Sequence, residues 1–190
     1  MRTAVCLVLL FSAVCSPTFA QADPALPGRL REGGYVLYLR HASTDMTRND
    51  ASMKSYEDCA SQRDLTDKGR AEARTIGEHV RRLKIPIGEV LASPFCRTMD
   101  TARLAFGRAQ ASNEVRGGPV QASRYEALQK LLSTPVSKGE NRVISSHGNP
   151  FYALAGAPYL AEGEMAVVEP QGSGFAVVGR VGIDDWQLLH

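Results

Sequence analysis

The sequence predicts a three-layer α/β domain, in which helices flank a largely parallel β-sheet. Strand-like and helix-like patterns alternate along the chain, which is typical of this class. Three of the apolar runs end at or just before arginine or histidine residues. Because open α/β sheets place their chemistry at the carboxyl ends of their strands, these polar residues mark the expected site.

The first 22 residues have the layout of a secretory signal. Arg2 precedes an apolar stretch over residues 4–14, and small residues suited to cleavage follow it. The stretch is too short to span a bilayer comfortably, so we expect no stable membrane insertion of the mature chain. Residues 1–22 are therefore expected to be removed, leaving residues 23–190 as one periplasmic or secreted domain. Lipoprotein processing at Cys15 is the alternative.

Three apolar runs are expected to form central strands: residues 36–39, 89–93 and 142–146. Arg40 and His41 follow the first run, Arg97 follows the second, and His147 ends the third. In a parallel sheet, these four side chains converge on one edge. Arginine binds phosphate oxygens in bidentate fashion, and a histidine held among arginines can attack phosphorus. The pattern therefore predicts a site for phosphoryl transfer.

The segments that flank the first strand are predicted as follows. Residues 23–33 contain two prolines and are expected to be a leader into that strand. Residues 43–62 are polar and lack a period, which indicates a long loop. Thr66 can cap a helix with an apolar stripe that includes Ile76, and its arginines are expected to form a solvated face. Arg48, Arg63 and Arg103 are likewise expected to be surface charges.

Two later junctions place a capping side chain before a proline, directly after an apolar strand. Ser93-Pro94 and Asn149-Pro150 are each expected to begin a helix at the sheet edge, and the first helix is expected to end at Gly107. Such helix starts favour bound anions. The remaining expected elements are a short helix around residues 126–132 and a hairpin of residues 166–168 with 175–178.

Cysteine usage points to an oxidising compartment. Of the four cysteines, Cys6 and Cys15 lie in the leader, which leaves Cys59 and Cys96 as one possible pair. A disulfide between them would contribute about 3 to 4 kcal/mol in the chain-entropy model and would pin the turn that carries Arg97. Two free buried thiols are the alternative. A catalytic cysteine is disfavoured, since neither has an arginine six positions later.

Charge and motif content exclude several other classes. The formal net charge of +2 and the lack of a basic run argue against a nucleic-acid partner. No Gly-x-Ser-x-Gly elbow surrounds Ser145 or Ser146, which disfavours a serine hydrolase. Neighbouring arginines would repel a metal cation from His41 and His147. We therefore expect no metal and no other cofactor.

Four motifs occur together in one order: residues 39–42, 65–69, 93–98 and 146–148. They are similar to the Arg-His-Gly motif, the helix-start signature, the second arginine motif and the second histidine motif of one known family. On these motifs the chain resembles the histidine phosphatase superfamily, which contains phosphoglycerate mutase, acid phosphatases and phytases. The resemblance implies a phosphoglycerate mutase-like fold. The leader and the two cysteines look most like the small periplasmic branch, which includes enzymes that act on lipopolysaccharide-core heptose phosphate.

The resemblance also implies a mechanism. His41 would attack phosphorus to give a phosphohistidine, while Arg40, Arg97 and His147 hold the phosphoryl oxygens. Water would then release phosphate. The expected substrate is a small phosphomonoester or an envelope glycolipid phosphate. The alternative is a weak or inactive periplasmic protein that binds a phosphate ligand on the same scaffold.

Two positions depart from the family pattern. Ala42 stands where the family usually has glycine. The second histidine lacks the aspartate that supplies the general acid in the phytase-like branch. By similarity to the mutase-like branch, Glu126 is the candidate general acid, although it can equally be a carboxylate at the start of a helix. Glu162 and Glu164 are further candidates.

Overall fold

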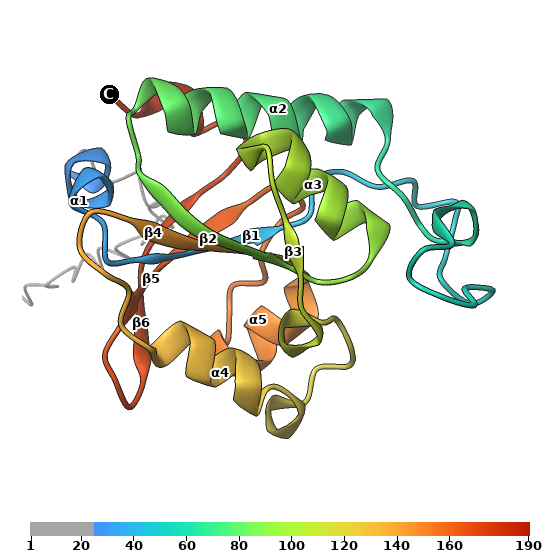
Figure 1. Ribbon diagram of the computed structural model, residues 1–190. Helices are drawn as coiled ribbons and strands as arrows, with labels where there is room; N and C mark the ends of the chain where they lie inside the picture. The colour runs from blue at the N-terminus through green and yellow to red at the C-terminus, as the bar shows by residue number, and fades with distance from the viewer. Residues whose placement is uncertain (1–24) are drawn as a thin grey trace, which may run out of the picture.

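The computed structural model describes residues 25–190, so the predicted signal lies outside the described part of the chain. Figure 1 shows one sheet between two layers of helices. The strands are β1 (Val36–Arg40), β2 (Ile87–Ala92), β3 (Gln110–Ala111), β4 (Asn141–Ser146), β5 (Met165–Pro170) and β6 (Phe175–Val181). The α-helices are α1 (Leu26–Glu32), α2 (Asp67–Arg82), α3 (Cys96–Phe106), α4 (Glu126–Ser133) and α5 (Gly148–Ala155).

The sheet is mixed, with a parallel centre. Its strand order is β3-β2-β4-β1-β5-β6, and the first four of these strands pair in parallel. β5 and β6 form the predicted hairpin and pair antiparallel, with β5 lying against β1. In the β1–β4 pair, Arg40 lies opposite Ser146, which brings the predicted site residues to one edge. The prediction of an α/β domain with a largely parallel, helix-flanked sheet is confirmed.

Strand β1 is buried on both faces and divides the core into two clusters. Leu37 and Leu39 pack on the side of α2 and α3, whereas Val36 and Tyr38 pack on the side of α4 and α5. This alternation follows from the two-residue period of a strand. Burying each of these side chains contributes about 1.5–3 kcal/mol, so the strand that ends at the site is firmly fixed.

Residues 26–32 form helix α1, so the predicted leader is wrong for this segment. Pro27 fits the first turn of the helix, where a missing N–H costs nothing. Leu26 and Leu30 lie four residues apart and are both buried in the core. No helix is expected from the sequence of this leader, but burial of the apolar pair favours one.

Helices α3 and α5 begin at other residues than predicted. Helix α3 begins at Cys96 and α5 at Gly148, and neither has a capping hydrogen bond from a side chain. The Ser93 hydroxyl instead lies 2.8 Å from Nε2 of His147. The Asn149 amide donates to the carbonyl of Gly118 at 2.9 Å. The expected capping groups therefore serve the site, while the predicted stop of α3 at a left-handed Gly107 is confirmed.

Helix α2 begins as predicted. Thr66 Oγ1 accepts a hydrogen bond from the N–H of Gly69 at 3.0 Å. A side chain at Gly69 would collide with the backbone, because its Cβ would lie 2.0 Å from the carbonyl oxygen of Ser43. The glycine therefore lets α2 start directly against the chain that follows His41.

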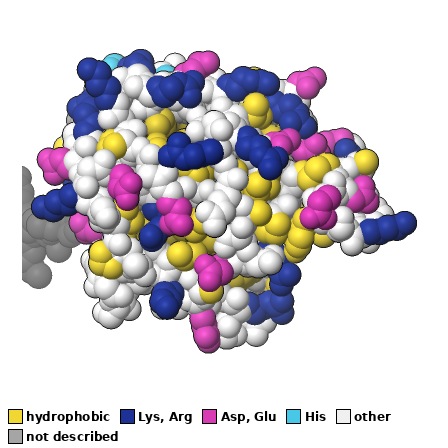
Figure 2. Space-filling model, in the orientation of Figure 1, with side chains coloured by type: hydrophobic (Ala, Val, Ile, Leu, Met, Phe, Trp, Pro, Cys, Tyr) yellow, Lys and Arg dark blue, Asp and Glu magenta, His cyan; other side chains and the backbone are white. Residues whose placement is uncertain are grey.

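The outer face of α2 is polar, as predicted. Figure 2 shows Lys and Arg side chains spread over the α2 and α3 side of the molecule, with Asp and Glu among them. Arg74 and Arg81 are exposed. Arg70 departs from this pattern because it pairs with Asp64 and Asp100, each at 2.9 Å. It therefore ties α2 to α3.

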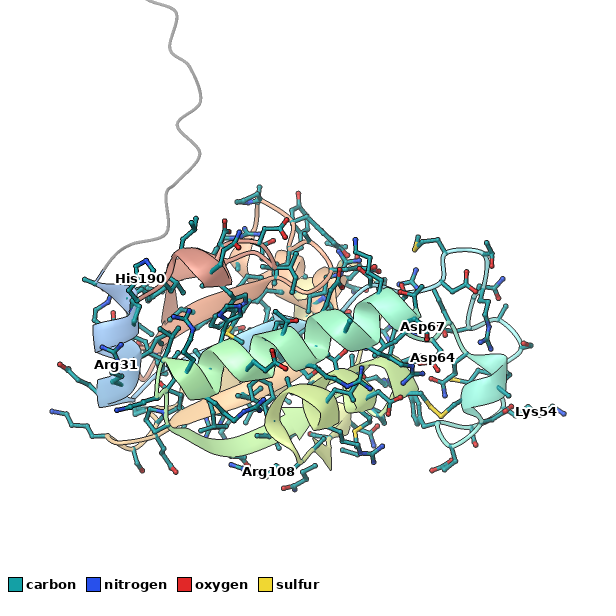
Figure 3. The ribbon with its side chains drawn as sticks, turned by 90° about the horizontal axis from the view of Figure 1, so that it is seen from above. Arg31, Lys54, Asp64, Asp67, Arg108 and His190 are labelled. Atoms are coloured by element: carbon teal, nitrogen blue, oxygen red, sulfur yellow. A yellow bond between two sulfur atoms is a disulfide. The ribbon has the colours of Figure 1, made fainter. Side chains whose placement is uncertain are left out.

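Residues 43–62 form the predicted long loop, which projects beyond the start of α2 (Figure 3, near Lys54). The predicted disulfide is present: Cys59 and Cys96 are bonded, with their Cα atoms 5.7 Å apart. Gln62 reinforces this link, since its buried carbonyl accepts from the N–H of Cys96 at 2.9 Å. The loop is thus attached to the residue before Arg97.

Across residues 25–190, none of the helices combines the length and the apolar character that crossing a membrane requires.

Candidate active site

The carboxyl ends of β1, β2 and β4 surround a cavity of about 300 Å³. Its lining includes four of the predicted site residues, Arg40, His41, Arg97 and His147. The two imidazole ring centroids lie 5.5 Å apart. Residues more than 100 positions apart in the chain therefore meet at one edge because parallel strands end there. Among residues 25–190, no group of three or more His, Cys, Asp or Glu residues is arranged to share a metal ion.

His41 is held with one ring nitrogen toward the cavity. Its side chain is 2% exposed, and Nδ1 lies 3.0 Å from the carbonyl oxygen of Ala42. A carbonyl only accepts hydrogen bonds, so Nδ1 carries the proton and Nε2 carries the lone pair. Burial lowers the pKa of His41 from 6.5 to about 3, against the effect of the Ala42 hydrogen bond and with help from Arg97 and Arg40. At neutral pH the ring is therefore uncharged, with a free lone pair at Nε2.

Ala42 fits where the family usually has glycine. Lys84 is the single non-glycine residue with a positive φ in the described chain, so the backbone at Ala42 is unstrained. Its methyl group packs with Leu65 and Ala73. Its N–H donates to Thr101 Oγ1 at 3.1 Å, and the same hydroxyl donates to the carbonyl of Arg97 at 2.6 Å.

Arg40 is held by the segment between α5 and β5. Its Nη1 donates to the carbonyl of Leu160 at 2.6 Å, and its Nη2 lies 3.5 Å from a Glu162 oxygen. The guanidinium carbon lies 5.2 Å from the centroid of the Tyr159 ring. These contacts fix the guanidinium at the cavity wall.

Arg97 is held by the disulfide-linked loop. Its Nη1 donates to Asp50 Oδ1 at 3.0 Å and to the carbonyl of Arg63 at 3.1 Å. Its guanidinium carbon lies 4.5 Å from the centroid of the Phe95 ring. Burial lowers the pKa of Arg97, and the hydrogen bond to Asp50 opposes this shift.

The cavity arginines have buried donors without an acceptor. The Nε atoms of Arg40, Arg63 and Arg97 are buried, and none has a hydrogen-bond partner within residues 25–190. The three guanidinium groups line one cavity, and their positive charges suit an anion with several oxygens. The arrangement is suited to binding a phosphoryl group.

His147 has a different environment from His41. Its Nε2 lies 2.8 Å from Ser93 Oγ, and its carbonyl accepts from the Tyr38 hydroxyl at 2.8 Å. Burial lowers the pKa of His147 well below its usual value, and the electrostatic effects of His41 and of the Arg97 charge act in the same direction. Gly117 lies against this ring, since a Cβ there would be 2.7 Å from its Cδ2.

Several lining residues were missed or misassigned in the sequence. Asp50 and Arg63 lie on or beside the polar loop, and Arg63 lines the cavity, so its prediction as a surface charge is wrong. Tyr159 and Phe95 also line the cavity. Their contacts cross from one segment to another, and no local spacing encodes them. Only the placement of the loop at the sheet edge pointed to this region.

The candidate acids lie in three different environments. Glu126 is exposed at the start of α4 and does not line the cavity, so its role as general acid stays a prediction. Glu164 pairs with Arg180 at 2.6 Å. Glu162 lies within 4 Å of His41, Arg40 and Arg63.

Comparisons with known proteins agree with this geometry. A profile of the histidine phosphatase superfamily (branch 1) matches residues 36–118, which contain the first three motifs. A sequence search of curated proteins gives no match.

Solved structures share the fold at low sequence identity. A protein from Agrobacterium tumefaciens assigned as the phosphohistidine phosphatase SixA is 17% identical, with a TM-score of 0.55 over 79% of this chain and 98% of its own. The protein histidine phosphatase SixA complexed with tungstate is 18% identical, with a TM-score of 0.54 over 80% and 98%.

A third similar structure is a His-to-Ala mutant of phosphoserine phosphatase from Entamoeba histolytica in complex with phosphoserine. It is 10% identical, with a TM-score of 0.56, and the match covers 80% of this chain and 98% of that one. The profile match and the shared fold agree with the four motifs around the cavity. Residues 36–118 of this chain match the histidine phosphatase superfamily, and this match, together with the shared fold, supports a phosphatase.

Proposed function

We propose that the protein hydrolyses phosphomonoesters through a phosphohistidine at His41. One observation carries this proposal: the lone pair of His41 Nε2 is available beside a cavity that Arg40, Arg63 and Arg97 line. A phosphoryl group bound there would be held by these guanidinium groups and would present phosphorus to the imidazole. His147 would supply a further contact to a phosphoryl oxygen.

The chemistry proceeds in two steps. In the first, an N–P bond forms at Nε2 of His41 while the ester P–O bond breaks, and the leaving oxygen takes a proton from a general acid, for which Glu126 is the candidate, or from water. The ring then carries a positive charge, and its Nδ1–H still donates to the Ala42 carbonyl. In the second step, water attacks phosphorus, the N–P bond breaks, and inorganic phosphate leaves a neutral histidine. The arginines stabilise the oxygens in both transition states.

We also propose that the enzyme works outside the cytoplasm, on a cell-envelope sugar phosphate. The Cys59–Cys96 disulfide supports an oxidising compartment. Candidate substrates to compare are an envelope sugar phosphate, phosphoserine and a phosphohistidine peptide, because the similar structures include a phosphoserine phosphatase and a protein assigned as a phosphohistidine phosphatase.

The test is hydrolysis of an activated aryl phosphate by purified residues 23–190, with a chelator present, followed by trapping of labelled phosphate. An aryl oxygen leaves without a proton, so the first step is measurable whatever the acid. We expect turnover and an acid-labile, base-stable label, both lost in His41→Ala. His79→Ala is the control, because the His79 ring stacks on Trp186 outside the cavity, and it should keep both turnover and label.

Phosphate binding should survive in His41→Ala, because the arginines remain. Wild-type turnover in that variant would disprove the mechanism. A folded wild-type protein that binds phosphate without turnover or label would instead be a binding protein on this scaffold.

A further inference from the structure

Glu162 lies on the segment between α5 and β5, next to Arg40 and Arg63, which line the cavity. One carboxylate oxygen, Oε1, lies 3.5 Å from Arg40 Nη2 and 3.7 Å from Arg63 Nη2. Thr44 fixes the group from the other side, since its hydroxyl donates to Oε1 at 2.8 Å and its N–H donates to Oε2 at 3.1 Å. The carboxylate is therefore held in one orientation by side chains from three segments.

The same oxygen lies 3.9 Å from Nδ1 of His41. Within residues 25–190, Glu162 is the one carboxylate within 4.0 Å of either ring nitrogen of His41. Asp50, the carboxylate that lines the cavity, contacts Arg97 instead.

The position of Glu162 beside Nδ1 of His41 excludes it as the acid that protonates the leaving group. It lies near Nδ1, whereas the nucleophilic nitrogen is Nε2 on the other side of the ring. The leaving oxygen departs in line with attack, on the far side of phosphorus. Glu162 is thus behind the nucleophile.

The charge of the His41 ring changes during the reaction. The ring is neutral before attack and positive in the phosphohistidine, so a nearby negative charge stabilises the product of the first step more than its reactant. A buried aspartate has this effect on the imidazolium of a Ser-His-Asp triad. Glu162 also attracts the positive charges of Arg40 and Arg63. Without Glu162, these two guanidinium groups would bind phosphoryl oxygens more tightly.

We propose that Glu162 is an electrostatic positioning residue, which stabilises the positive ring of phosphorylated His41 and restrains Arg40 and Arg63 from over-binding phosphate. The proposal rests on the proposed function, and it predicts opposite changes in two measured quantities. Removing the charge lowers kcat, because the ring charge loses its partner. It strengthens phosphate binding, because two guanidinium groups are released.

The test compares Glu162→Gln with wild type on the activated aryl phosphate. We expect kcat to fall by about tenfold to a hundredfold, as for the loss of one charge near the reacting group. We expect the inhibition constant for inorganic phosphate to fall by about threefold to tenfold. Glu162→Asp keeps the charge and should recover part of kcat.

Glu89→Gln is the matched control. Glu89 is also a carboxylate that pairs with an arginine, Arg142, but it does not line the cavity, so both constants should stay at wild-type values. A Glu162→Gln variant that loses kcat and phosphate affinity together would show a merely structural role and overturn the proposal. Unchanged constants would overturn it as well.

The two proposals fail separately. Absence of a label in the wild-type protein contradicts the phosphohistidine route itself. A labelled wild-type protein without the opposite changes in Glu162→Gln contradicts the role of Glu162 alone. Far-ultraviolet circular dichroism checks that the variants are folded, and if Glu162→Gln is unfolded, Thr44→Val tests the same carboxylate by releasing it from its hydroxyl partner.

Discussion

The end of β1 and the end of β4 each deliver a buried, neutral histidine to one cavity, but the two rings are held differently. His41 is tied at Nδ1 by a backbone carbonyl, which leaves Nε2 free. His147 is engaged at Nε2 by Ser93. Burial is the largest cause of the lowered pKa at both rings. The hydrogen bond, and not the degree of burial, therefore distinguishes the two rings, and it is the basis for proposing His41 as the nucleophile.

The arginines beside these histidines differ in the same way. Arg40 is held by a segment late in the chain, through Leu160 and Glu162. Arg97 is held by Asp50, on a loop that the disulfide attaches to α3. One half of the site thus depends on the core strands and their connections, and the other depends on a covalent link.

Replacing His147 gives the largest expected effect on rate after loss of the nucleophile. In His147→Gln we expect kcat to fall by about a hundredfold to a thousandfold, as for removal of one donor to a transition-state oxygen. The label on His41 should still form, only more slowly. Rapid-quench labelling measures both, and a label lost in His147→Gln but kept in His41→Ala would reverse the two roles.

Removing the disulfide tests the dependence of Arg97 on the loop. The double variant Cys59→Ala/Cys96→Ala should lose about 3 to 4 kcal/mol in the free energy of unfolding. Urea denaturation followed by circular dichroism measures this loss. Phosphate affinity should also weaken, because Asp50 and Arg63 no longer hold Arg97 in place. Lower stability with unchanged phosphate affinity would show that Arg97 is positioned without the loop.

A further expected effect, which does not involve the rate, is on the pH dependence of stability. Because the pKa of His41 is about 3 when folded and 6.5 when unfolded, the unfolded chain binds a proton below pH 6.5 that the folded chain refuses. The stability contribution is complete above pH 6.5 and falls toward pH 3, by up to about 1.4 kcal/mol per pH unit.

His41→Gln isolates this contribution, since glutamine does not titrate. We compare the free energies of unfolding of wild type and His41→Gln. The wild-type value minus the variant value should decrease as the pH is lowered from about 6.5 to 3. Urea denaturation at several pH values provides the difference. A constant difference would mean that His41 titrates alike in both states.

Much of the site was predictable because the apolar residues of a strand are adjacent in the sequence. β1, β2 and β4 are apolar runs that end at Arg40, near Arg97 and at His147, and parallel pairing brings these ends together. The loop partners were not predictable in this way. Asp50 and Arg63 reach the cavity through a disulfide-linked loop, whose path depends on tertiary contacts.

The predicted first residues of α3 and α5 were wrong for a related physical reason. Ser93 and Asn149 have side chains that can cap a helix or bond across the site, and the sequence alone does not rank these partners. The packed structure favours the His147 ring and the Gly118 carbonyl. Helix α1 was missed because its apolar pair packs against strands far away in the sequence.

The Thr101 hydroxyl links the segment after β1, which carries His41, to helix α3, which carries Arg97. It accepts from the N–H of Ala42, next to the nucleophile, and donates to the carbonyl of Arg97. One oxygen atom therefore holds the backbone next to His41 at a fixed distance from the backbone of Arg97. Since misplacement by about 1 Å can cost a hundredfold in rate, we expect this small side chain, remote from any substrate, to limit how well the two halves work together.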